Sequence, residues 1–473
     1  MTIAIHWFRR DLRLTDNTAL NAAISAHDQI VPVYVLSQWK KHHQWTGAPR
    51  QQFLVENLAS LSTSLRKAGS HLVIRQGEAL AELKALVKET GASAIYANRD
   101  PDPFGRAVEA DLEKLAEQLG IQLHLYKDVA LHEQNEVLTG SNSPFRVFTP
   151  YCKAWSKLDK PLPGRTVTRL LTPPNIRSLP LPTLQTWELK PDGTELPAAG
   201  ETAAQARLER FLEKAVYHYV ERRDIPSIDG TSRISQDLRF GLLSIRKVYA
   251  RLLDCAKGLK EPQARSLQIY INELCWREFY FQVLWNKPEV LELEYSEAYR
   301  GMPWKKDPES LERWQKGLTG FPIVDAGMRQ LRQTGFMHNR VRMIVAMFLT
   351  KDLHLDWREG ERWFMQRLLD GEIASNNGGW QWSSGTGTDA APYFRIQNPW
   401  TQGLRFDSAG EYIKRWVPEL ASVPGPRLHQ PPSPGLRLVS SYPLPMVEHA
   451  EERNISLATY KLHLSSSRST IVG

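Results

Sequence analysis

The first third of the chain alternates short apolar runs with stretches of helical periodicity. Five runs have the length and composition of buried strands, at residues 3–7, 30–36, 71–75, 94–97 and 122–126. An amphipathic stretch between two of these runs repeats leucine at helical spacing, at Leu54, Leu58, Leu61 and Leu65. Strands that alternate with helices predict an α/β domain with a five-stranded parallel sheet, doubly wound so that helices cover both faces.

The pattern changes at a proline-rich stretch. Eight prolines fall within residues 161–200, and this density excludes helix interiors and favours an extended connector. Beyond residue 200 strand patterns almost vanish, and helical periodicity dominates residues 201–222, 235–257, 262–286, 322–352 and 356–369. We therefore expect an α/β domain over residues 1–130, a connector over 131–200 and an all-α domain over 201–473.

The composition argues against a membrane protein, a secreted protein and a metal-stabilised fold. The chain has 473 residues, of which 42% are hydrophobic and 24% charged, as in globular proteins with a large core. No apolar run approaches the roughly 20 residues needed to span a bilayer, and the first residues lead into Arg9, Arg10 and Asp11 rather than a signal peptide. Three scattered cysteines suit neither a disulfide framework nor a zinc site. We expect a cytoplasmic protein without a membrane segment or a metal.

The net charge of +8 is unevenly distributed along the chain. Residues 1–150 contain 16 Lys+Arg and 16 Asp+Glu, whereas the remaining 323 residues contain 44 and 36. Because the excess positive charge lies after residue 150, the C-terminal part of the chain is suited to bind a polyanion such as DNA. A soluble basic protein without such a partner would show the same surplus, so charge alone leaves both interpretations open.

The first predicted strand is not followed by a glycine-rich phosphate loop. Where a G-x-G-x-x-G fingerprint would stand, the chain reads Trp7-Phe8-Arg9-Arg10-Asp11. The sheet therefore need not hold the main cofactor.

Segment 370–382 combines carboxylates, amides, glycines and two indoles. Cores avoid unpaired carboxylates and amides because their burial is costly, and glycines allow a flat ligand to approach the backbone closely. Trp380 and Trp382 should face different environments, since residues two apart point to different sides of a helix or a strand. The alternative is ordinary core packing, which accounts for most tryptophans in proteins.

A second cluster is predicted on one face of a helix. Four residues recur at i, i+3, i+4 and i+7: Glu273, Trp276, Arg277 and Tyr280. The opposite face is apolar, with Leu267, Ile271, Leu274 and Phe281. The polar face is either a surface ion pair with an incidental indole, or the mouth of a pocket in which Arg277 reaches an anionic ligand.

Two further segments allow a structural and a functional interpretation. Thr231, Ser232 and Ser235 place hydroxyls at an expected helix start, which suits a pyrophosphate or is simply an N-cap. A face of the expected long helix over 322–352 carries Asn339, Arg342 and Met343. That face belongs either to a ligand site or to an ordinary helix with solvated arginines.

Taken in order, these motifs resemble the photolyase/cryptochrome family, in particular class I cyclobutane-pyrimidine-dimer DNA photolyases. The resemblance covers nearly the whole chain, at residues 7–17, 148–150, 221–235, 273–280, 320–329, 337–343, 356–362, 370–382, 393–396 and 442–449. It implies an N-terminal α/β domain, a connector and a helical domain that holds FAD. The ordered set of motifs carries the resemblance, rather than any single one.

The resemblance implies roles for individual residues. Asn376 would face flavin N5, and the whole FAD-binding set comprises Tyr219, Thr231, Ser232, Ser235, Tyr270, Arg277, Arg342, Asp370, Glu372 and Asn376. The lesion cavity comprises Glu273, Trp276, Asn339, Met343 and Trp382. The tryptophan relay, which would reduce the flavin from the surface, comprises Trp380, Trp357 and Trp304. Candidates for contacts with DNA phosphates are Lys153, Arg223, Arg340 and Arg395.

The function implied by the resemblance is light-driven repair of cyclobutane pyrimidine dimers in UV-damaged DNA, double- or single-stranded. Excited, reduced FAD would pass an electron to the flipped-out dimer, the cyclobutane ring would split, and the electron would return. We expect a monomeric carbon–carbon lyase that associates with the nucleoid through DNA. An antenna chromophore on the α/β domain is also implied: a deazaflavin, FMN or methenyltetrahydrofolate. Gly105 stands near the place where folate-binding relatives have an acidic residue, which argues against folate.

Three alternatives share some of these features. A cryptochrome-type blue-light photoreceptor has the same fold and flavin, but the dimer-cavity residues are all present here, and only 24 residues follow His449, too few for a long signalling tail. A (6-4) photolyase is a weaker match, because Asn339 stands where that class has a histidine. A structural DNA-binding protein would leave Asn376 and the tryptophan relay without a purpose.

Overall fold

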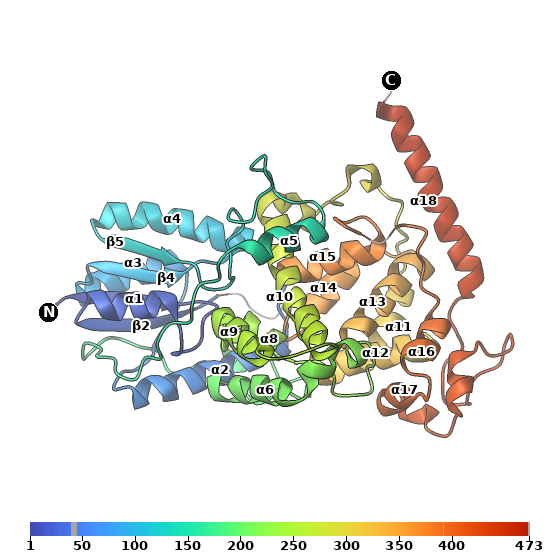
Figure 1. The fold of residues 1–473 in the computed structure, drawn as a ribbon, viewed down its shortest axis with the longest axis horizontal. Coiled ribbons are helices and arrows are strands. Elements are labelled where there is room, and N and C mark those ends of the chain that lie inside the picture. The colour runs from blue at the N-terminus through green and yellow to red at the C-terminus, as the bar shows by residue number, and fades with distance from the viewer. Residues whose placement is uncertain (39–44, 391, 472–473) are drawn as a thin grey trace. The chain divides into compact units, whose positions relative to one another are not determined.

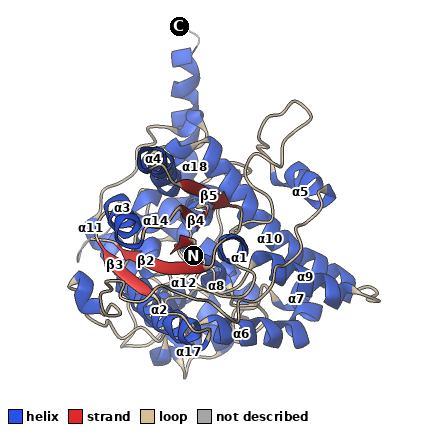
Figure 2. Cartoon of the chain, turned by 90° about the vertical axis from the view of Figure 1, so that its left-hand side faces the viewer, coloured by secondary structure: helices blue, strands red, loops and turns tan. Residues whose placement is uncertain are grey.

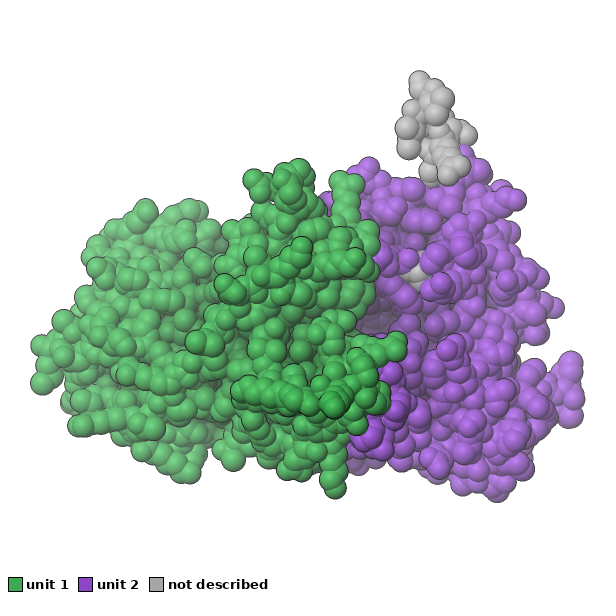
Figure 3. Space-filling view, in the orientation of Figure 1, with its two compact units in different colours: residues 1–192, 196–217, 232–286 green, residues 193–195, 218–231, 287–473 purple. Residues whose placement is uncertain are grey.

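A computed structural model describes residues 1–38, 45–390 and 392–471, with side chains described up to residue 466. The chain forms two compact units, coloured separately in Figure 3. Unit 1 comprises residues 1–192, 196–217 and 232–286, and unit 2 comprises residues 193–195, 218–231 and 287–473. The domain limits at residues 130 and 200 stay predictions.

Unit 1 is built on a five-stranded sheet in the order β3-β2-β1-β4-β5, in which all neighbouring strands are parallel. The strands are β1 (Ile3–Phe8), β2 (Gln29–Leu36), β3 (Val73–Gln76), β4 (Ala94–Asn98) and β5 (Gln122–Tyr126). In register, Ile5 of β1 lies between Val31 of β2 and Ile95 of β4. All five predicted strands are confirmed. The third begins two residues later than expected, because pairing with β2 starts at Val73.

Helices alternate with these strands and cover both faces of the sheet. They are α1 (Thr18–Ala26), α2 (Ala48–Lys67), α3 (Ala79–Thr90) and α4 (Pro103–Leu119). Leucines of α3 and α4 share one buried cluster with Ile5, Trp7 and Val33. Helix α1 contacts β1, β4 and β5, and Figure 2 shows it on the side of the strands away from α3 and α4. The predicted doubly wound α/β arrangement is therefore confirmed.

Local signals fix the ends of these helices. Helix α4 starts where the Asp102 carboxylate accepts a hydrogen bond from the Gly105 N–H at 2.7 Å, with proline in the first turn. It ends at Gly120, whose φ of 64° is the left-handed conformation that glycine adopts readily. A side-chain cap of this kind contributes about 1 kcal/mol to stability. The residues that begin and end α4 are therefore types that commonly mark helix ends in a sequence.

The remainder of unit 1 is an irregular stretch followed by helices. The proline-rich residues 161–200, all described, contain one short 3-10 helix, η1 (Leu184–Trp187), and no α-helix or strand. The helices around this stretch are α5 (Phe148–Lys157), α6 (Glu201–Glu213), α8 (Ser235–Arg239), α9 (Ile245–Ala256) and α10 (Gln263–Asn286). The 24-residue α10 matches the helix predicted over 262–286.

Unit 2 is helical, with no strand among its described residues (Figure 1). Its longer helices are α11 (Pro308–Lys316), α12 (Pro322–Thr334), α13 (Asn339–Met347), α14 (Trp357–Arg367), α15 (Ile373–Ser384), α16 (Pro399–Phe406), α17 (Glu411–Trp416) and α18 (His449–Ile471). Its short elements are η2 (Ala215–His218, which begins in unit 1), α7 (Tyr219–Arg222), η3 (Pro288–Leu291), η4 (Glu297–Tyr299), the π-helical η5 (Phe348–Asp352), η6 (Pro418–Leu420) and η7 (Gly425–His429).

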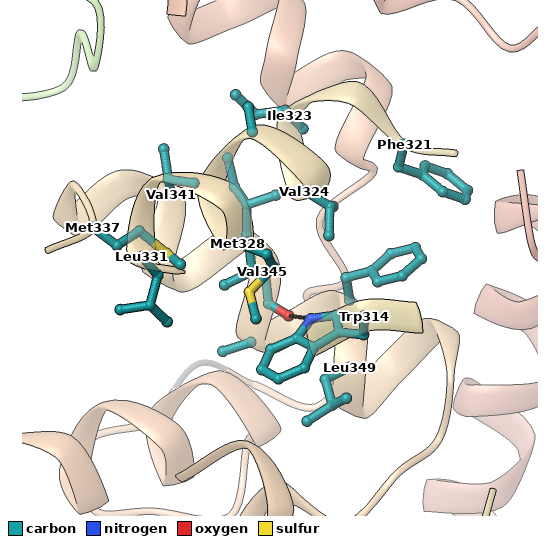
Figure 4. Close-up of a cluster of buried hydrophobic side chains, with 14 of the residues drawn as sticks. Trp314, Phe321, Ile323, Val324, Met328, Leu331, Met337, Val341, Val345 and Leu349 are labelled. Carbon is teal, nitrogen blue, oxygen red and sulfur yellow. Dashed lines mark hydrogen bonds between the residues drawn. The ribbon is translucent and has the colours of Figure 1, made fainter. Parts of the chain in front are cut away.

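The core of unit 2 gathers around a buried tryptophan. The Trp314 indole N–H donates to the Val345 carbonyl at 3.1 Å, and Met328 and Leu349 lie beside the ring (Figure 4). Aliphatic side chains of α12 and α13 lie around them, and the cluster extends to aromatic side chains of α14, α15, α16 and α17. The backbone carbonyl satisfies the one polar atom of the indole, as buried indoles require. In the described part of the chain, no helix is both long and apolar enough to cross a membrane.

Three of the predicted long helices are broken. The helix expected over 322–352 ends at Thr334, because Gly335 takes a φ of 64°, and a new helix begins at Asn339 behind the cap of His338. A side chain at 335 would bring a Cβ within 2.7 Å of Leu369. The helix over 235–257 is interrupted between α8 and α9, and that over 201–222 at the end of α6. The helix expected over 356–369 is confirmed as α14.

Candidate functional site

Helix α10 of unit 1 presents the predicted polar face. Glu273, Trp276, Arg277 and Tyr280 are all partly exposed, whereas the opposite residues Leu267, Ile271, Leu274 and Phe281 are buried. This confirms the two-faced helix that the spacing predicts. The Trp276 ring stacks on Phe148 of α5, with centroids 3.6 Å apart and planes at 6°. Trp276 therefore has one flat face already covered by Phe148.

The guanidinium of Arg277 contacts a backbone carbonyl and an aromatic ring. Its Nη1 donates to the Val129 carbonyl at 2.7 Å, and its Cζ lies 4.6 Å from the centre of the Phe281 ring. Among the described residues no carboxylate forms an ion pair with it. Burial lowers the pKa of Arg277 to about 9, the positive charge of Arg10 acts in the same direction, and Glu278 opposes them. An anion bound at Arg277 would offset this destabilised charge, as the proposed ligand-binding role requires.

The hydroxyl-rich segment does not cap a helix as expected. Helix α8 has five residues, its N-cap is Ile234, and no side chain caps it. The N-cap interpretation of Thr231, Ser232 and Ser235 is therefore wrong, since Ser235 is already the first helical residue. Ser232 instead hydrogen-bonds Tyr270, which partly opposes the rise that burial causes in the pKa of that phenol. Thr231 and the buried Tyr219 belong to unit 2, and Ser232, Ser235 and Tyr270 to unit 1.

Helices α13 and α15 of unit 2 carry the other predicted FAD residues. Arg342, one turn into α13, pairs with Asp370 at 2.9 Å and donates from Nε to the Met337 carbonyl at 2.8 Å. Glu372 is buried at the N-cap of α15. The Asn376 side chain donates from Nδ2 to the Glu361 carbonyl at 3.1 Å. This contact leaves the amide oxygen of Asn376 as its acceptor for a ligand.

One face of α15 is open enough to receive a flat ring. Gly379 lies three residues after Asn376, so both lie on the same side of the helix. Gly379 is exposed, and a Cβ built there would meet nothing within 4 Å. The other side of the helix is fixed, because Asn377 and Gln381 each donate to the Val290 carbonyl at 2.9 Å. The Asn376 amide and the Arg342 guanidinium can hydrogen-bond a flavin, and Gly379 leaves room for its flat ring.

Trp380 and Trp382 lie in different environments, as predicted. Trp380 is 2% exposed and packs edge-to-face against Trp314 and Phe364. Its ring also lies so close to α14 that a Cβ on Gly360 would be 2.0 Å from it. Trp382 is partly exposed. Only Trp382 is therefore placed to contact a large external ligand.

Trp357 and Trp304 share one hydrogen-bond acceptor. Their indole N–H groups both donate to Oε1 of Glu294, at 3.3 Å and 3.4 Å. Arg358 pairs with the other oxygen of that carboxylate at 3.1 Å. Trp357 is fully buried and Trp304 is partly exposed, so of these two only Trp304 is accessible from the surface. The relay stays a prediction.

The predicted phosphate contacts differ in how far they are already engaged. Lys153 on α5 and Arg395 are exposed. Arg223 lies over the Tyr219 ring at 5.6 Å. Arg340 pairs with Asp224 at 2.8 Å and lies over the Phe406 ring at 4.5 Å. A DNA phosphate would therefore have to compete with Asp224 for Arg340. Asn339 is exposed at the start of α13, and Met343 is partly buried one turn later.

The carboxyl edge of the sheet is filled with charge pairs. In a sheet of this strand order, the space beyond β1 and β4 is the usual ligand crevice. Here Arg10 pairs with Asp100 at 2.7 Å, and Arg9 pairs with Glu109. A side chain at Gly105 would collide, because its Cβ would lie 2.3 Å from the Asp100 Cβ. Within the described residues, no three His, Cys, Asp or Glu side chains gather so that they could hold a metal ion.

Sequence reasoning missed two carboxylates that organise unit 2, Glu294 and Glu361. Glu361 is 1% exposed, accepts from Asn377 Nδ2 at 3.0 Å, and has no cation within 4.0 Å among the described residues. Burial raises the pKa of Glu361 to about 8, so this carboxyl is protonated at neutral pH. The position of Glu361 between Trp357 and Trp363 could have marked it in the sequence, whereas Glu294 lies in a segment with no motif.

Comparison with known proteins adds a family assignment to this geometry. Residues 4–167 match the family model described as DNA photolyase, and residues 270–462 match that of the FAD binding domain of DNA photolyase. A deoxyribodipyrimidine photo-lyase of Agrobacterium fabrum is 39% identical, over 96% of this chain and 97% of the relative. These matches confirm the predicted fold class and the predicted cofactor, FAD.

Two solved structures resemble the whole chain. A bacterial class III photolyase from Agrobacterium tumefaciens has a TM-score of 0.91 at 38% identity and covers 98% of both chains. A cryptochrome of Synechocystis has a TM-score of 0.87 at 30% identity, covering 97% of this chain and 99% of its own. Both a repair protein and a cryptochrome therefore share this fold.

Proposed function

Because the chain belongs to the DNA photolyase family, we propose that it repairs cyclobutane pyrimidine dimers in UV-damaged DNA with the energy of light. One observation carries the proposal: 39% identity to a deoxyribodipyrimidine photo-lyase over nearly the full length of both chains. When bound and reduced, FAD supplies the electron that splits the dimer after light is absorbed. The protein has to hold FAD, admit the lesion and return FAD to its reduced state.

The proposed FAD-binding role falls on two sets of residues. In unit 2, Arg342, Asp370 and Asn376 would hold the cofactor, supported by Glu372, Tyr219 and Thr231. The Asn376 amide is oriented by its bond to the Glu361 carbonyl, so its oxygen is the atom that can accept from a protonated flavin nitrogen. In unit 1, Arg277 would neutralise negative charge, and Ser232, Ser235 and Tyr270 would supply hydroxyl groups. The open face at Gly379 supports the proposal.

The lesion-binding role is assigned to Glu273, Trp276, Asn339, Met343 and Trp382. Trp276 and Trp382 offer indole faces on which fused pyrimidines can stack. Since Phe148 covers one face of Trp276, the lesion would use the other face or the ring edge. Glu273 and Asn339 would hydrogen-bond the pyrimidine edges. Lys153, Arg223, Arg340 and Arg395 would contact the phosphates of a single DNA molecule bound by a monomer in the cytoplasm.

The class of the enzyme and its antenna are finer proposals. We assign the chain to class I on its motifs, while a class III enzyme is similar over 98% of both chains. A phylogenetic tree that includes members of both classes decides between the two. For the antenna, a deazaflavin or FMN fits better than a folate, because an acidic side chain at 105 would collide with Asp100. Extraction and mass spectrometry of the bound chromophores test this choice.

A cryptochrome-type photoreceptor is the second candidate function, favoured by the similarity to the Synechocystis cryptochrome. The deciding experiment incubates the purified, reduced protein with UV-irradiated DNA and counts dimers with and without blue light. We expect light-dependent loss of dimers and none in the dark. Unchanged dimer counts with fully reduced flavin would favour the photoreceptor.

A further inference from the structure

Two of the three cysteines lie next to each other in unit 1, although they are far apart in the sequence. Cys152 on α5 is partly exposed, whereas Cys275 on α10 is 0% exposed. The Cys152 thiol donates to Oδ1 of Asn272 at 3.6 Å, and Asn272 lies one turn before Cys275 on the same face of α10. The Cys275 thiol in turn donates a hydrogen bond to the Cys152 sulfur. The two sulfur atoms are therefore neighbours.

Contacts on both sides of the thiols hold α5 against α10. One turn before Cys152, the Phe148 ring stacks on Trp276 with centroids 3.6 Å apart. About one turn after Cys152, the Trp155 indole N–H donates to the buried Glu278 carboxylate at 2.6 Å. Because these contacts flank the pair, the packing of two helices keeps the sulfur atoms in register.

The two thiols differ in their readiness to react. The hydrogen bond from Cys275 lowers the pKa of Cys152 to about 7, the Ser156 hydroxyl and the charge of Lys160 act in the same direction, and burial opposes them. Burial raises the pKa of the Cys275 thiol. At neutral pH, Cys152 is therefore partly a thiolate that solvent can reach, beside a second cysteine that stays a thiol. Cysteines that sense oxidants combine an accessible thiolate with a resolving cysteine in this way.

We propose that Cys152 and Cys275 are a redox-active pair, which a peroxide closes to a disulfide that ties α5 to α10 beside Trp276. The pair lies outside the residues to which FAD, the relay and the lesion cavity are assigned.

The reaction takes two steps with hydrogen peroxide as the oxidant. The Cys152 thiolate attacks one peroxide oxygen, the O–O bond breaks, and a sulfenic acid and hydroxide form. The hydroxide takes up the proton that Cys152 had released to solvent. The Cys275 sulfur then attacks the sulfenic sulfur, the S–O bond breaks, and the departing hydroxyl leaves as water with the Cys275 proton. Two thiols and one peroxide thus give one disulfide and two waters.

The expected consequence for DNA rests on the proposed role of Trp276 in binding the lesion. Phe148, which covers one face of Trp276, is carried by α5. A covalent bond from Cys152 to α10 would remove the freedom of α5 to move away, so Phe148 could not give way to a stacking pyrimidine. We expect the oxidised protein to bind dimer-containing DNA about three- to tenfold more weakly than the reduced protein.

The test treats the folded holoenzyme with hydrogen peroxide, blocks the remaining thiols by alkylation and maps the cysteines by peptide mass spectrometry. We expect a linked pair of peptides containing Cys152 and Cys275, lighter by two hydrogens and separated again by dithiothreitol. Cys152→Ala should give no link. Cys255→Ser is the matched control, since Cys255 on α9 is also partly exposed but lies outside the pair, and this variant should form the link as the wild type does.

The same samples are then titrated with a dimer-containing oligonucleotide in the dark, with the flavin oxidised in all of them. Peroxide should weaken binding in the wild type and in Cys255→Ser, and dithiothreitol should restore it. Binding by Cys152→Ala should not respond to either treatment.

The outcomes separate this inference from the proposed function. Cysteines that all remain open to alkylation after peroxide, or a Cys152 that is oxidised without a link to Cys275, would overturn the redox pair. A link that leaves lesion affinity unchanged would overturn its effect on DNA binding. If the reduced protein does not remove dimers in light, the proposed function fails, and the peptide map still decides whether the pair exists.

Discussion

Two of the buried glutamates of unit 2, Glu294 and Glu361, lie in opposite electrostatic settings. Glu294, 2% exposed on its side chain, faces Arg358 and the indole N–H groups of Trp357 and Trp304. Glu361, beneath the Asn376 end of α15, receives a hydrogen bond from the neutral amide of Asn377 and has its pKa raised to about 8 by burial. The same side chain is thus held in an ion pair at one place and kept protonated at the other.

The difference corresponds to where charge would develop during the proposed reaction. Oxidation of Trp357 or Trp304 puts positive charge on an indole, and a carboxylate at its N–H stabilises that charge. A protonated Glu361 adds no negative charge next to Asn376, where reduced FAD, itself an anion, would be bound. Buried carboxyls can therefore be assigned roles from their partners, even where their burial is equal.

We expect the largest effect, a loss of stability, when the ion-paired Glu294 is replaced by alanine. Glu294→Ala would leave two indole N–H groups without their acceptor and would remove one of the two carboxylates that pair with Arg358, so we expect a loss of about 3–5 kcal/mol in the free energy of unfolding. Glu294→Gln keeps an acceptor oxygen and should fold. It removes the charge, however, and should slow flavin photoreduction about five- to tenfold. Denaturant unfolding and flavin absorbance under light measure the two effects. Unaltered photoreduction in Glu294→Gln would contradict the claim that the charge of Glu294 stabilises an oxidised indole.

The protonated glutamate predicts a dependence of stability on pH. A carboxyl whose folded pKa is raised from 4.5 to about 8 binds its proton more tightly when folded, so stability falls as pH rises between these values. Glu361→Gln removes this titration while keeping an acceptor for Asn377. From about pH 5.5 to about pH 7.5, the wild type should lose about 2–3 kcal/mol more than the variant. Parallel stability curves for the two proteins would show that Glu361 is ionised when folded.

Trp276 provides a contrast with the tryptophans held by Glu294, because its flat ring rather than its N–H is the proposed point of contact. Trp276→Ala should weaken binding to dimer-containing DNA by about 1–3 kcal/mol through the loss of one stacking surface. FAD absorbance should be unchanged. Titration of the variant with a lesion-containing oligonucleotide checks this, with Glu294→Gln as a control that should bind normally. Equal affinity of a folded Trp276→Ala protein would remove this residue from the cavity.

The smallest expected effect concerns Arg340. Arg340→Ala should weaken binding to lesion-containing DNA and reduce the magnitude of the log–log salt slope by about 1 at most, because Asp224 already neutralises part of its charge. Arg395→Ala, which removes an exposed arginine, should have at least as large an effect. Binding isotherms at several salt concentrations measure both slopes. A slope that Arg340→Ala leaves unchanged would indicate that this guanidinium stays with Asp224.

Much of the fold was predictable because its signals are local. Buried strands such as β1 and β4 are continuous apolar runs, and α10 and α14 show helical periodicity over their whole length. The break between α12 and α13 was not read from the sequence. It depends on Gly335 taking a left-handed φ next to Leu369 and on His338 acting as a cap. Periodicity on either side continues across this break.

The site was predictable where residues lie on one helix, and not where distant segments meet. The spacing alone placed Trp276 and Arg277 on one face of a helix, and the structure shows both partly exposed. Glu294 lies 63 positions from Trp357, and nothing in its own segment marks it as the acceptor for two indoles. The pairing of Arg340 with Asp224 likewise joins residues 116 positions apart. Such contacts arise from tertiary packing, which a single sequence does not encode locally.

The central claim, light-driven repair with a separable reduction relay, is tested most directly by Trp304→Phe. Phenylalanine keeps an aromatic ring of similar shape but is much harder to oxidise, so the relay should stop while the fold persists. In the first stage, flavin absorbance is followed under light with an external donor. In the second, the flavin is reduced with dithionite and dimers in irradiated DNA are counted in light and dark. We predict that the variant fails to photoreduce its flavin, yet removes dimers in light as the wild type does. Normal photoreduction would contradict the relay, and undiminished dimers with both reduced proteins in light would contradict repair itself.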